Sequence, residues 1–239
     1  MRSSEISRFF LGLIYPGICP VCNKIIPSRS ADICPHCIDR LSFVGNSFCM
    51  RCGKPVDDDK EYCSDCRGKH HDYDEGRAVL IYDEVASSSI YRFKYNGKRE
   101  YASFYARIMS ERLGRKIKSW NVDAIVPVPI HPSKLKKRGY NQAQLIADRL
   151  SKRLGIRMDC GLITRKRATG VQKNLSAKGR QNNLKKAFII SKNSVKLDSV
   201  LIVDDIYTTG ATVDAMARCL KGAGVKKVYF AALCIGRGN

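Results

Sequence analysis

Four cysteine pairs in the first third of the chain constrain its fold more than any other feature. Each pair is a C-x-x-C motif, and the eight residues are Cys19, Cys22, Cys34, Cys37, Cys49, Cys52, Cys63 and Cys66. The last two pairs repeat the first two at nearly the same spacing, which indicates an internal duplication. Two thiolates of one C-x-x-C turn can bind one ion, and a second turn completes the tetrahedral four-sulfur shell of structural zinc. The spacing therefore predicts two structural Zn²⁺ sites in a double zinc ribbon.

The spacing leaves the order of ligand pairing open. Sequential pairing gives one ion to the first four cysteines and one to the last four, whereas a cross-braced arrangement alternates the pairs. Either arrangement fills all four coordination positions, so we expect no catalysis at zinc. Redox-active cysteine pairs are the main alternative, but four of them in tandem are typical of metal binding rather than of thiol exchange.

The start of the chain shows no pattern of a membrane span or a secretion signal. Its longest apolar run, residues 9–15, is too short to cross a bilayer. It also lacks the basic flank and the small-residue cleavage site of a signal peptide, so we expect a short amphipathic helix there. A cytoplasmic location follows as the expectation, and it agrees with cysteines that bind metal instead of forming disulfides.

The chain is strongly basic, and the positive charge is concentrated in one region. It contains 43 Lys and Arg against 22 Asp and Glu, a net charge of +21. In residues 134–186 the only acidic residues are Asp148 and Asp159. Such a field attracts polyanions, either nucleic acid or small polyphosphates. A solvated basic face without a ligand is the alternative interpretation.

The chain after the cysteines has the pattern of an α/β domain. Strands are expected at residues 78–82, 123–128, 187–190, 200–203 and 227–234, and helices at 88–95, 100–113, 141–154 and 211–221. This alternation predicts a parallel sheet covered by helices on both faces. Ligands bind at the carboxyl ends of strands in such sheets, here after residues 128, 163 and 203. With a polar join near 67–76, we predict a ribbon domain over 1–70 and an α/β domain over 77–239.

The stretch VLIVDDIYTTGATV, residues 200–213, combines two carboxylates with a loop suited to phosphate. Asp204 and Asp205 follow the expected strand, and residues 208–212 open the next helix. Backbone N–H groups at a helix start, hydroxyl groups and a glycine form a site for one small anion. The loop lacks the lysine and the spacing of a Walker A motif. The combination indicates a sugar phosphate ligand. The alternative is that the two aspartates only cap the helix.

The same stretch resembles the phosphoribosyl pyrophosphate (PRPP) signature of type I phosphoribosyltransferases. The resemblance implies that Asp204 and Asp205 bind the ribose hydroxyls of PRPP, which is bound together with Mg²⁺. It also implies that the loop binds the 5′-phosphate through Thr208, Thr209, Gly210, Ala211 and Thr212.

A longer ordered set of motifs resembles the ComF family of bacterial competence proteins. It comprises the four cysteine pairs, F-K-Y-N-G at 93–97, V-P-V-P at 126–129, K-K-R-G-Y-N-Q at 136–142 and the segment 165–180. This resemblance implies a type I phosphoribosyltransferase-like parallel sheet flanked by helices and joined to an N-terminal double zinc ribbon. Together the motifs cover nearly the whole chain.

The family's fold implies where the pyrophosphate group of PRPP would bind. Arg138 is the preferred contact, with Lys137 adding positive charge, because a guanidinium donates hydrogen bonds to phosphate in a fixed fork. The segment from Arg165 through Gln172 to Arg180 resembles the hood, a loop that closes over PRPP and excludes water. Each single cation can also be an ordinary surface residue.

One residue departs from the pattern of the purine-salvage relatives. They carry an aspartate general base at the position of Thr208. Without that base, removing a proton from a nucleobase is harder, so an ammonia or amine acceptor fits better. The sequence also agrees with PRPP binding without turnover.

Three functions follow as hypotheses. The first is a role in natural transformation, in which the basic face binds incoming single-stranded DNA and Tyr91, Phe93, Tyr95 or Tyr140 offers a stacking surface. The second is an active phosphoribosyltransferase that is unrelated to DNA. The third is an adaptor whose ribbons bind a competence helicase, with PRPP as the ligand that sets its state.

Overall fold

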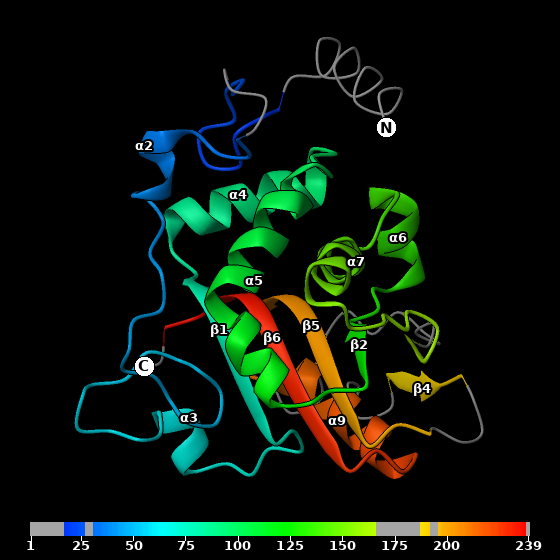
Figure 1. Cartoon of the computed structure of the whole chain (residues 1–239). Coiled ribbons are helices and arrows are strands. Elements are labelled where there is room, and N and C mark those ends of the chain that lie inside the picture. Colours follow the sequence, from blue (N-terminus) through cyan, green and yellow to red (C-terminus); the bar gives the residue numbers. More distant parts are fainter. Residues whose placement is uncertain (1–16, 27–30, 166–186, 192–195, 238–239) are drawn as a thin grey trace, which may run out of the picture.

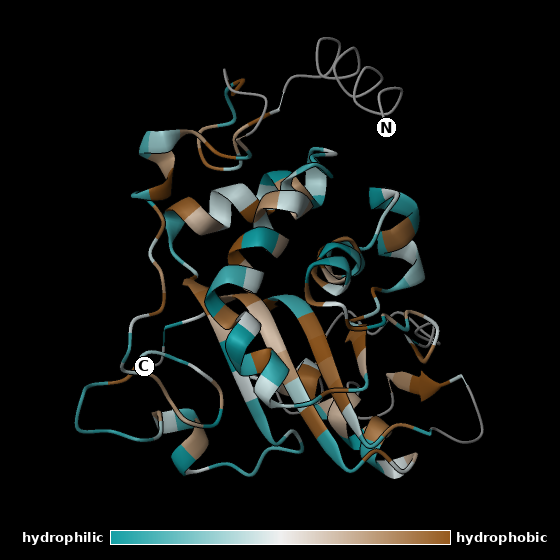
Figure 2. Ribbon diagram, in the orientation of Figure 1, coloured by the Kyte–Doolittle hydropathy of each residue, from teal (hydrophilic) through white to brown (hydrophobic). Residues whose placement is uncertain are grey.

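The structure is a computed structural model, which describes residues 17–26, 31–165, 187–191 and 196–237. Its centre is a sheet of four parallel strands in the order β1-β6-β5-β2 (Figure 1). The strands are β1 (Glu75–Ile81), β2 (Ala124–Pro127), β5 (Ser199–Tyr207) and β6 (Lys227–Ile235). In Figure 2 the apolar residues form brown sections of these strands, most clearly along β5. A parallel sheet that is covered on both faces needs such continuous apolar runs, and the predicted α/β architecture is confirmed.

Helices on both faces bury the sheet. Four long helices surround it: α4 (Glu84–Tyr95), α5 (Tyr101–Ser119), α7 (Gln142–Leu154) and α9 (Ala211–Gly222). Local sequence signals set their ends. The Asp83 carboxylate accepts a hydrogen bond from the N–H of Ala86 at the start of α4, and α7 ends at Gly155 in the left-handed region with φ +71°.

Three short helices complete the helical part of the described chain. They are α2 (Pro35–Ile38), α3 (Ser64–Arg67) and α6 (Pro132–Arg138). The sequence pattern did not predict α6. It begins at a proline, whose fixed φ and missing N–H suit the first helical position, and it ends at Gly139 with φ +75°.

A separate two-stranded antiparallel sheet corrects one prediction. It consists of β3 (Ile163–Arg165) and β4 (Phe188–Ile190), which pair with each other. The prediction that the strand ending near Ile163 and the strand 187–190 belong to the parallel sheet was therefore wrong, whereas the ligand site expected after Ile163 stays a prediction. A run of three apolar residues indicates a strand, but its pattern does not identify the partner strand.

The two ribbons pack into two different cores. Alternate residues of the sheet point to opposite faces, so Leu201 belongs to the core under α4, α5 and α7, whereas Ile202 belongs to the core under α9. Buried cysteines of the first ribbon, such as Cys19, lie in the first core. Buried cysteines of the second ribbon, such as Cys52, lie in the second core. Each ribbon therefore helps to cover a different face of the sheet.

The chain between the two ribbons protects the edge of the sheet. The N–H of Val44 donates to the carbonyl oxygen of Val79 at 2.9 Å, and the N–H of Ile81 donates to that of Ser42 at 2.8 Å. These bonds satisfy backbone groups of β1 that an open edge would leave unpaired.

The segment near 67–76, predicted as a polar join between the domains, is partly buried in the fold. Tyr73 is fully buried, His71 is nearly so, and β1 already begins at Glu75. The segment packs against β5, β6 and α9, as described for the functional site below.

Gly76 provides a test of this packing. A Cβ on Gly76 would lie 1.9 Å from the ring of Phe230, which is itself stacked on Tyr207 with centroids 4.5 Å apart. We predict that Gly76→Ala lowers the free energy of unfolding in urea by about 1–3 kcal/mol, because the ring has to move. Gly45→Ala, which meets no atom within 4 Å, is the control and should change stability by less than about 0.5 kcal/mol. Equal stability of the two variants would contradict the observed packing.

Candidate functional site

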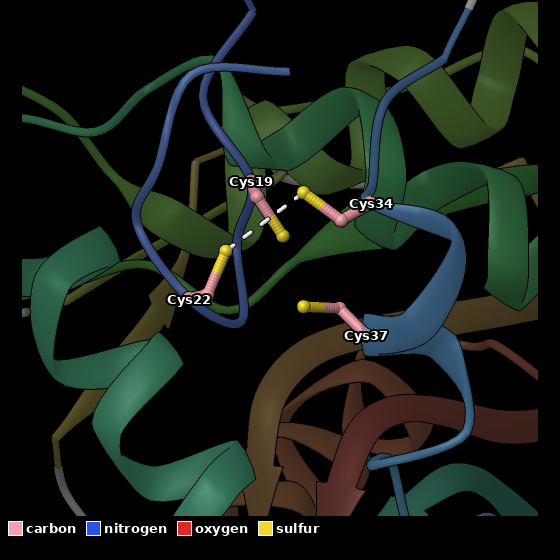
Figure 3. Close-up of side chains that lie close together, drawn as sticks. All are labelled: Cys19, Cys22, Cys34 and Cys37. Carbon is pink, nitrogen blue, oxygen red and sulfur yellow. Dashed lines mark hydrogen bonds between the residues drawn. The ribbon is translucent and has the colours of Figure 1, made fainter. Parts of the chain in front are cut away.

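The eight cysteine sulfurs gather in two groups. One group contains Cys19, Cys22, Cys34 and Cys37, and the other contains Cys49, Cys52, Cys63 and Cys66. All sulfur atoms of a group lie within 4.8 Å of one another. Figure 3 shows the four side chains of the first group pointing toward a common centre. The grouping is sequential, so the cross-braced alternative is excluded.

The spacing of the sulfurs fits zinc. A tetrahedral site with Zn–S bonds of about 2.3 Å has sulfur-to-sulfur edges of about 3.8 Å. Cys22 and Cys34 are 3.8 Å apart, and Cys52 and Cys63 are 3.6 Å apart. Four thiolates form a closed ligand set, which is typical of structural zinc rather than catalytic zinc.

The first ribbon is anchored on α4. The Arg92 guanidinium donates to the carbonyl oxygens of Pro20 at 3.0 Å and Val21 at 2.8 Å. The Tyr101 hydroxyl at the start of α5 adds a bond to the Asn23 side chain at 2.8 Å. The ribbon therefore fixes the same helix that reaches the functional site.

Two carboxylates lie near the carboxyl end of β5. The strand continues to Tyr207, so Asp204 and Asp205 lie within it and not after it as the pattern predicted. Burial and the neighbouring charge of Asp205 raise the pKa of Asp204 to about 8. Asp205 is buried, and its Oδ1 accepts a hydrogen bond from the Lys94 Nζ at 2.9 Å. One carboxyl group is thus easily protonated, whereas the other has a cationic partner.

Lys94 is a site residue that the sequence analysis missed. It lies in the last turn of α4, within the motif F-K-Y-N-G that supported the family resemblance. The motif indicated that this stretch is characteristic of the family. It could not predict the contact of Lys94 with Asp205, 111 positions away, because that contact depends on how α4 packs.

The loop after β5 forms a small hollow. A cavity of about 30 Å³ is lined by Asp204, Ile206, Tyr207, Thr208, Thr209, Gly210, Ala211, Thr212 and Val213. Gly210 has φ +77°, and a Cβ there would lie 2.5 Å from the Tyr207 hydroxyl oxygen. The loop leads directly into α9, whose free N–H groups and dipole favour a bound anion. All five predicted loop residues therefore line one anion-sized hollow.

Residues 69–73, which follow the second ribbon, contact this loop and the elements on either side of it. The Lys69 Nζ donates to the carbonyl oxygen of Thr209 at 3.3 Å. The His71 Nδ1 lies 2.9 Å from a carboxylate oxygen of Asp214 in the first turn of α9. The hydroxyls of Tyr73 and Tyr207 are 2.7 Å apart. The segment after the second ribbon is therefore joined to the loop and to α9 by one exposed and two buried polar contacts.

Arg138 and Lys137, the cations predicted to bind pyrophosphate, both lie on α6. Arg138 ends α6, donates to Gln142 at 2.9 Å and to the Tyr95 hydroxyl at 3.0 Å, and lies over the Tyr95 ring. Lys137 is exposed on the same helix.

Arg165 ends β3 and interacts electrostatically with Asp204. Burial lowers the pKa of its guanidinium, and the carboxylate of Asp204 opposes that shift. One residue of the predicted hood therefore interacts electrostatically with one of the two carboxylates. Gln172 and Arg180 lie outside the described residues.

The four candidate stacking aromatics fall into two classes. Phe93 and Tyr140 are buried in the core, whereas Tyr91 and Tyr95 are 59% and 50% exposed. Only the last two can offer a ring face to a ligand.

Comparisons with known proteins agree with this architecture. A family model described as a double zinc ribbon domain matches residues 10–67, and one described as a phosphoribosyl transferase domain matches residues 106–239. The DNA utilization protein YhgH of Escherichia coli K12 is 31% identical over 93% of this chain and 98% of its own length. Competence protein F of Haemophilus influenzae is 30% identical over 89% of this chain and 87% of its own.

The chain belongs to the ComF family of competence proteins. The Bacillus subtilis competence protein ComFC is also similar, at 28% identity over 80% of this chain and 79% of its own length. Among solved structures, the purine phosphoribosyltransferase from Pyrococcus horikoshii Ot3 matches 55% of this ComF-family chain and 74% of its own, at 22% identity and a TM-score of 0.37. The part of the chain that the structure describes contains no helix long and apolar enough to cross a membrane.

Zinc content gives a direct test of the two cysteine groups. We predict two zinc ions per chain by elemental analysis, one for each group. Cys22→Ser should remove one ion, because a closed four-sulfur site does not tolerate the loss of a thiolate. Cys160→Ser, at an exposed cysteine outside both groups, is the matched control and should retain both ions. A wild-type protein with fewer than two zinc ions would contradict the assignment.

Proposed function

We propose that this ComF-family protein binds PRPP with Mg²⁺ at the carboxyl end of β5 and handles incoming single-stranded DNA during natural transformation, in the cytoplasm. The observation that carries the PRPP part is the combination of two carboxylates and an anion-sized hollow at the end of β5 with two cations that interact with these carboxylates, Lys94 and Arg165. A sugar that carries phosphate on one side and pyrophosphate on the other needs this set of groups.

Each part of PRPP has a complementary group at the site. Asp204 and Asp205 would accept hydrogen bonds from the ribose hydroxyls, and the loop 208–212 would bind the 5′-phosphate. Arg138, Lys137 and Arg165 would face the pyrophosphate, and Gln172 and Arg180 would close the hood. Mg²⁺ supplies charge neutralisation to the pyrophosphate. Lys94 now pairs with Asp205, and ribose binding would release its ammonium group.

The DNA part of the proposal rests on charge and on the relatives. The net charge of +21 favours a polyanion, and the relatives that span most of the chain are named for competence and for DNA utilization. A helicase of the competence machinery is the protein partner that we propose for the ribbons.

Thr208 supports a second candidate function. The residue is exposed at the mouth of the loop, where a carboxylate base would serve a nucleobase acceptor. An amine acceptor can attack C1′ through its nitrogen lone pair and lose a proton to solvent afterwards, while pyrophosphate leaves. The second candidate is therefore transfer of ribose 5-phosphate from PRPP to ammonia or an amine, in a role unrelated to DNA. Release of pyrophosphate from PRPP with an amine present would support it.

Calorimetry of PRPP with Mg²⁺ tests the site. The wild type should bind, and the isosteric double variant Asp204→Asn, Asp205→Asn should bind at least about tenfold more weakly, because charge-assisted hydrogen bonds are lost. Asp198→Asn is the matched control, since its side chain is 75% exposed just before the opposite end of β5. It should bind like the wild type. Absence of binding to the wild type would refute the PRPP assignment.

The pH dependence of PRPP affinity gives an independent test. Asp204 has a pKa of about 8 in the free protein, so at lower pH a ligand that needs its ionised form has to displace a proton. Affinity should therefore rise with pH, by up to about tenfold per unit, and level off above about pH 8. Titration of the PRPP phosphates contributes equally to the wild type and to every variant. The single variant Asp204→Asn lacks the titrating carboxyl group, so its affinity should depend less on pH. Identical profiles of wild type and Asp204→Asn would count against this role of Asp204.

A further inference from the structure

An open cavity lies beside α4, next to the candidate PRPP site. Its volume is about 540 Å³, within the range of small-molecule sites. Its lining includes Tyr82, Tyr91, Arg92, Lys94, Tyr95 and Ile206. Ile206 follows directly after the ribose carboxylates of β5, so the cavity borders the site. The following paragraphs call it the α4 cavity.

Two tyrosines give the α4 cavity its aromatic surface. Tyr91 and Tyr95 lie one helical turn apart, and their ring centroids are 4.9 Å apart at an interplanar angle of 46°. Both residues are at least half exposed, although the same helix buries Phe93 completely. Two neighbouring aromatic rings that remain open to solvent are typical of a surface on which a planar ligand stacks.

Positive charges border the aromatic surface. Arg92 and Lys94 line the cavity, and its lining includes no acidic residue. The Arg138 guanidinium lies over the Tyr95 ring, 4.7 Å from its centroid. A planar ring surface edged by cations matches a nucleobase and the phosphates on either side of it.

We propose that the α4 cavity binds a base of single-stranded DNA, which stacks on Tyr91 and Tyr95 while Lys94 and Arg138 contact the neighbouring phosphates. The proposal rests on the proposed DNA function and adds the surface that performs it. A duplex keeps its base faces stacked inside the helix, so it cannot use this surface. The strong positive charge of the chain favours a polymer with many phosphates over a free nucleotide.

The same helix would connect DNA to PRPP. Lys94 pairs with Asp205, which belongs to the candidate ribose site, and Tyr95 bonds to Arg138, which belongs to the candidate pyrophosphate site. A base stacked on α4 would therefore lie one side chain away from the candidate ribose site and from the candidate pyrophosphate site.

Fluorescence anisotropy with a labelled oligodeoxythymidine of about 16 nucleotides, at constant salt, tests the proposal. The double variant Tyr91→Ala, Tyr95→Ala should bind at least about fivefold more weakly, because each base–aromatic stack is lost. Tyr91→Phe, Tyr95→Phe keeps both rings and should bind within about twofold of the wild type. Tyr62→Ala, at a 40% exposed tyrosine of the second ribbon, is the matched control and should bind like the wild type.

The possible outcomes separate this inference from the proposed function. Wild-type binding that the double alanine variant retains overturns the inference but not the DNA function. If the double phenylalanine variant loses as much affinity as the double alanine variant, the tyrosine hydroxyls bind the DNA and the stacking proposal is overturned. No binding by the wild type overturns both proposals. Thymidine monophosphate that displaces the oligomer at equal concentration would identify a free nucleotide as the ligand and overturn the inference.

Photochemical crosslinking provides a second readout that does not depend on any variant. An oligonucleotide with 5-iododeoxyuridine should crosslink to Tyr91 or Tyr95, because a stacked base holds its reactive carbon against the ring. Mass spectrometry of the crosslinked peptides locates the contact. Crosslinks found only outside residues 82–95 would contradict the proposed surface.

Discussion

Burial of the parallel sheet on both faces is the constraint on which the rest of this structure depends. The strands β5 and β6 are apolar on both sides, and the helices on either face cover them only in part. Each cysteine ribbon adds its own buried residues to one of the two cores. Zinc binding and sheet burial therefore stabilise one another, because a ribbon that loses its ion would expose part of a core.

The same burial shapes the chemistry of the site. Asp204 and Asp205 lie near the end of β5, where Asp205 is buried and Asp204 is partly buried at the edge of the hollow. Burial raises the pKa of Asp204, and the buried Asp205 is stabilised by the ammonium group of Lys94. The loop that follows is held in place from the opposite side by Tyr73 and His71. The candidate phosphate site thus depends on residues from three distant parts of the chain.

Helix α4 connects the parts of the molecule. Arg92 holds the first ribbon, Lys94 pairs with Asp205, and Tyr95 contacts Arg138, the cation proposed for pyrophosphate. These three residues are nearly consecutive, yet they point to three different neighbours because a helix turns by about 100° per residue. Tyr91 and Tyr95 remain exposed on the same helix. Helix α4 therefore contacts the first ribbon and borders both the proposed PRPP site and the proposed DNA surface.

The sequence by itself determined the features that are local. The C-x-x-C spacing predicted two four-sulfur shells, the order of strands and helices predicted a parallel α/β sheet, and the run from Asp204 to Thr212 predicted a phosphate loop beside two carboxylates. Only the tertiary structure decided which distant residues meet. It paired the cysteines in sequence, joined β3 to β4 outside the main sheet, placed Lys94 on Asp205, and exposed Tyr91 and Tyr95 while it buried Phe93 and Tyr140. The physical reason is that spacing and periodicity encode local geometry, whereas contacts across a hundred residues depend on how the helices and ribbons share the two faces of the sheet.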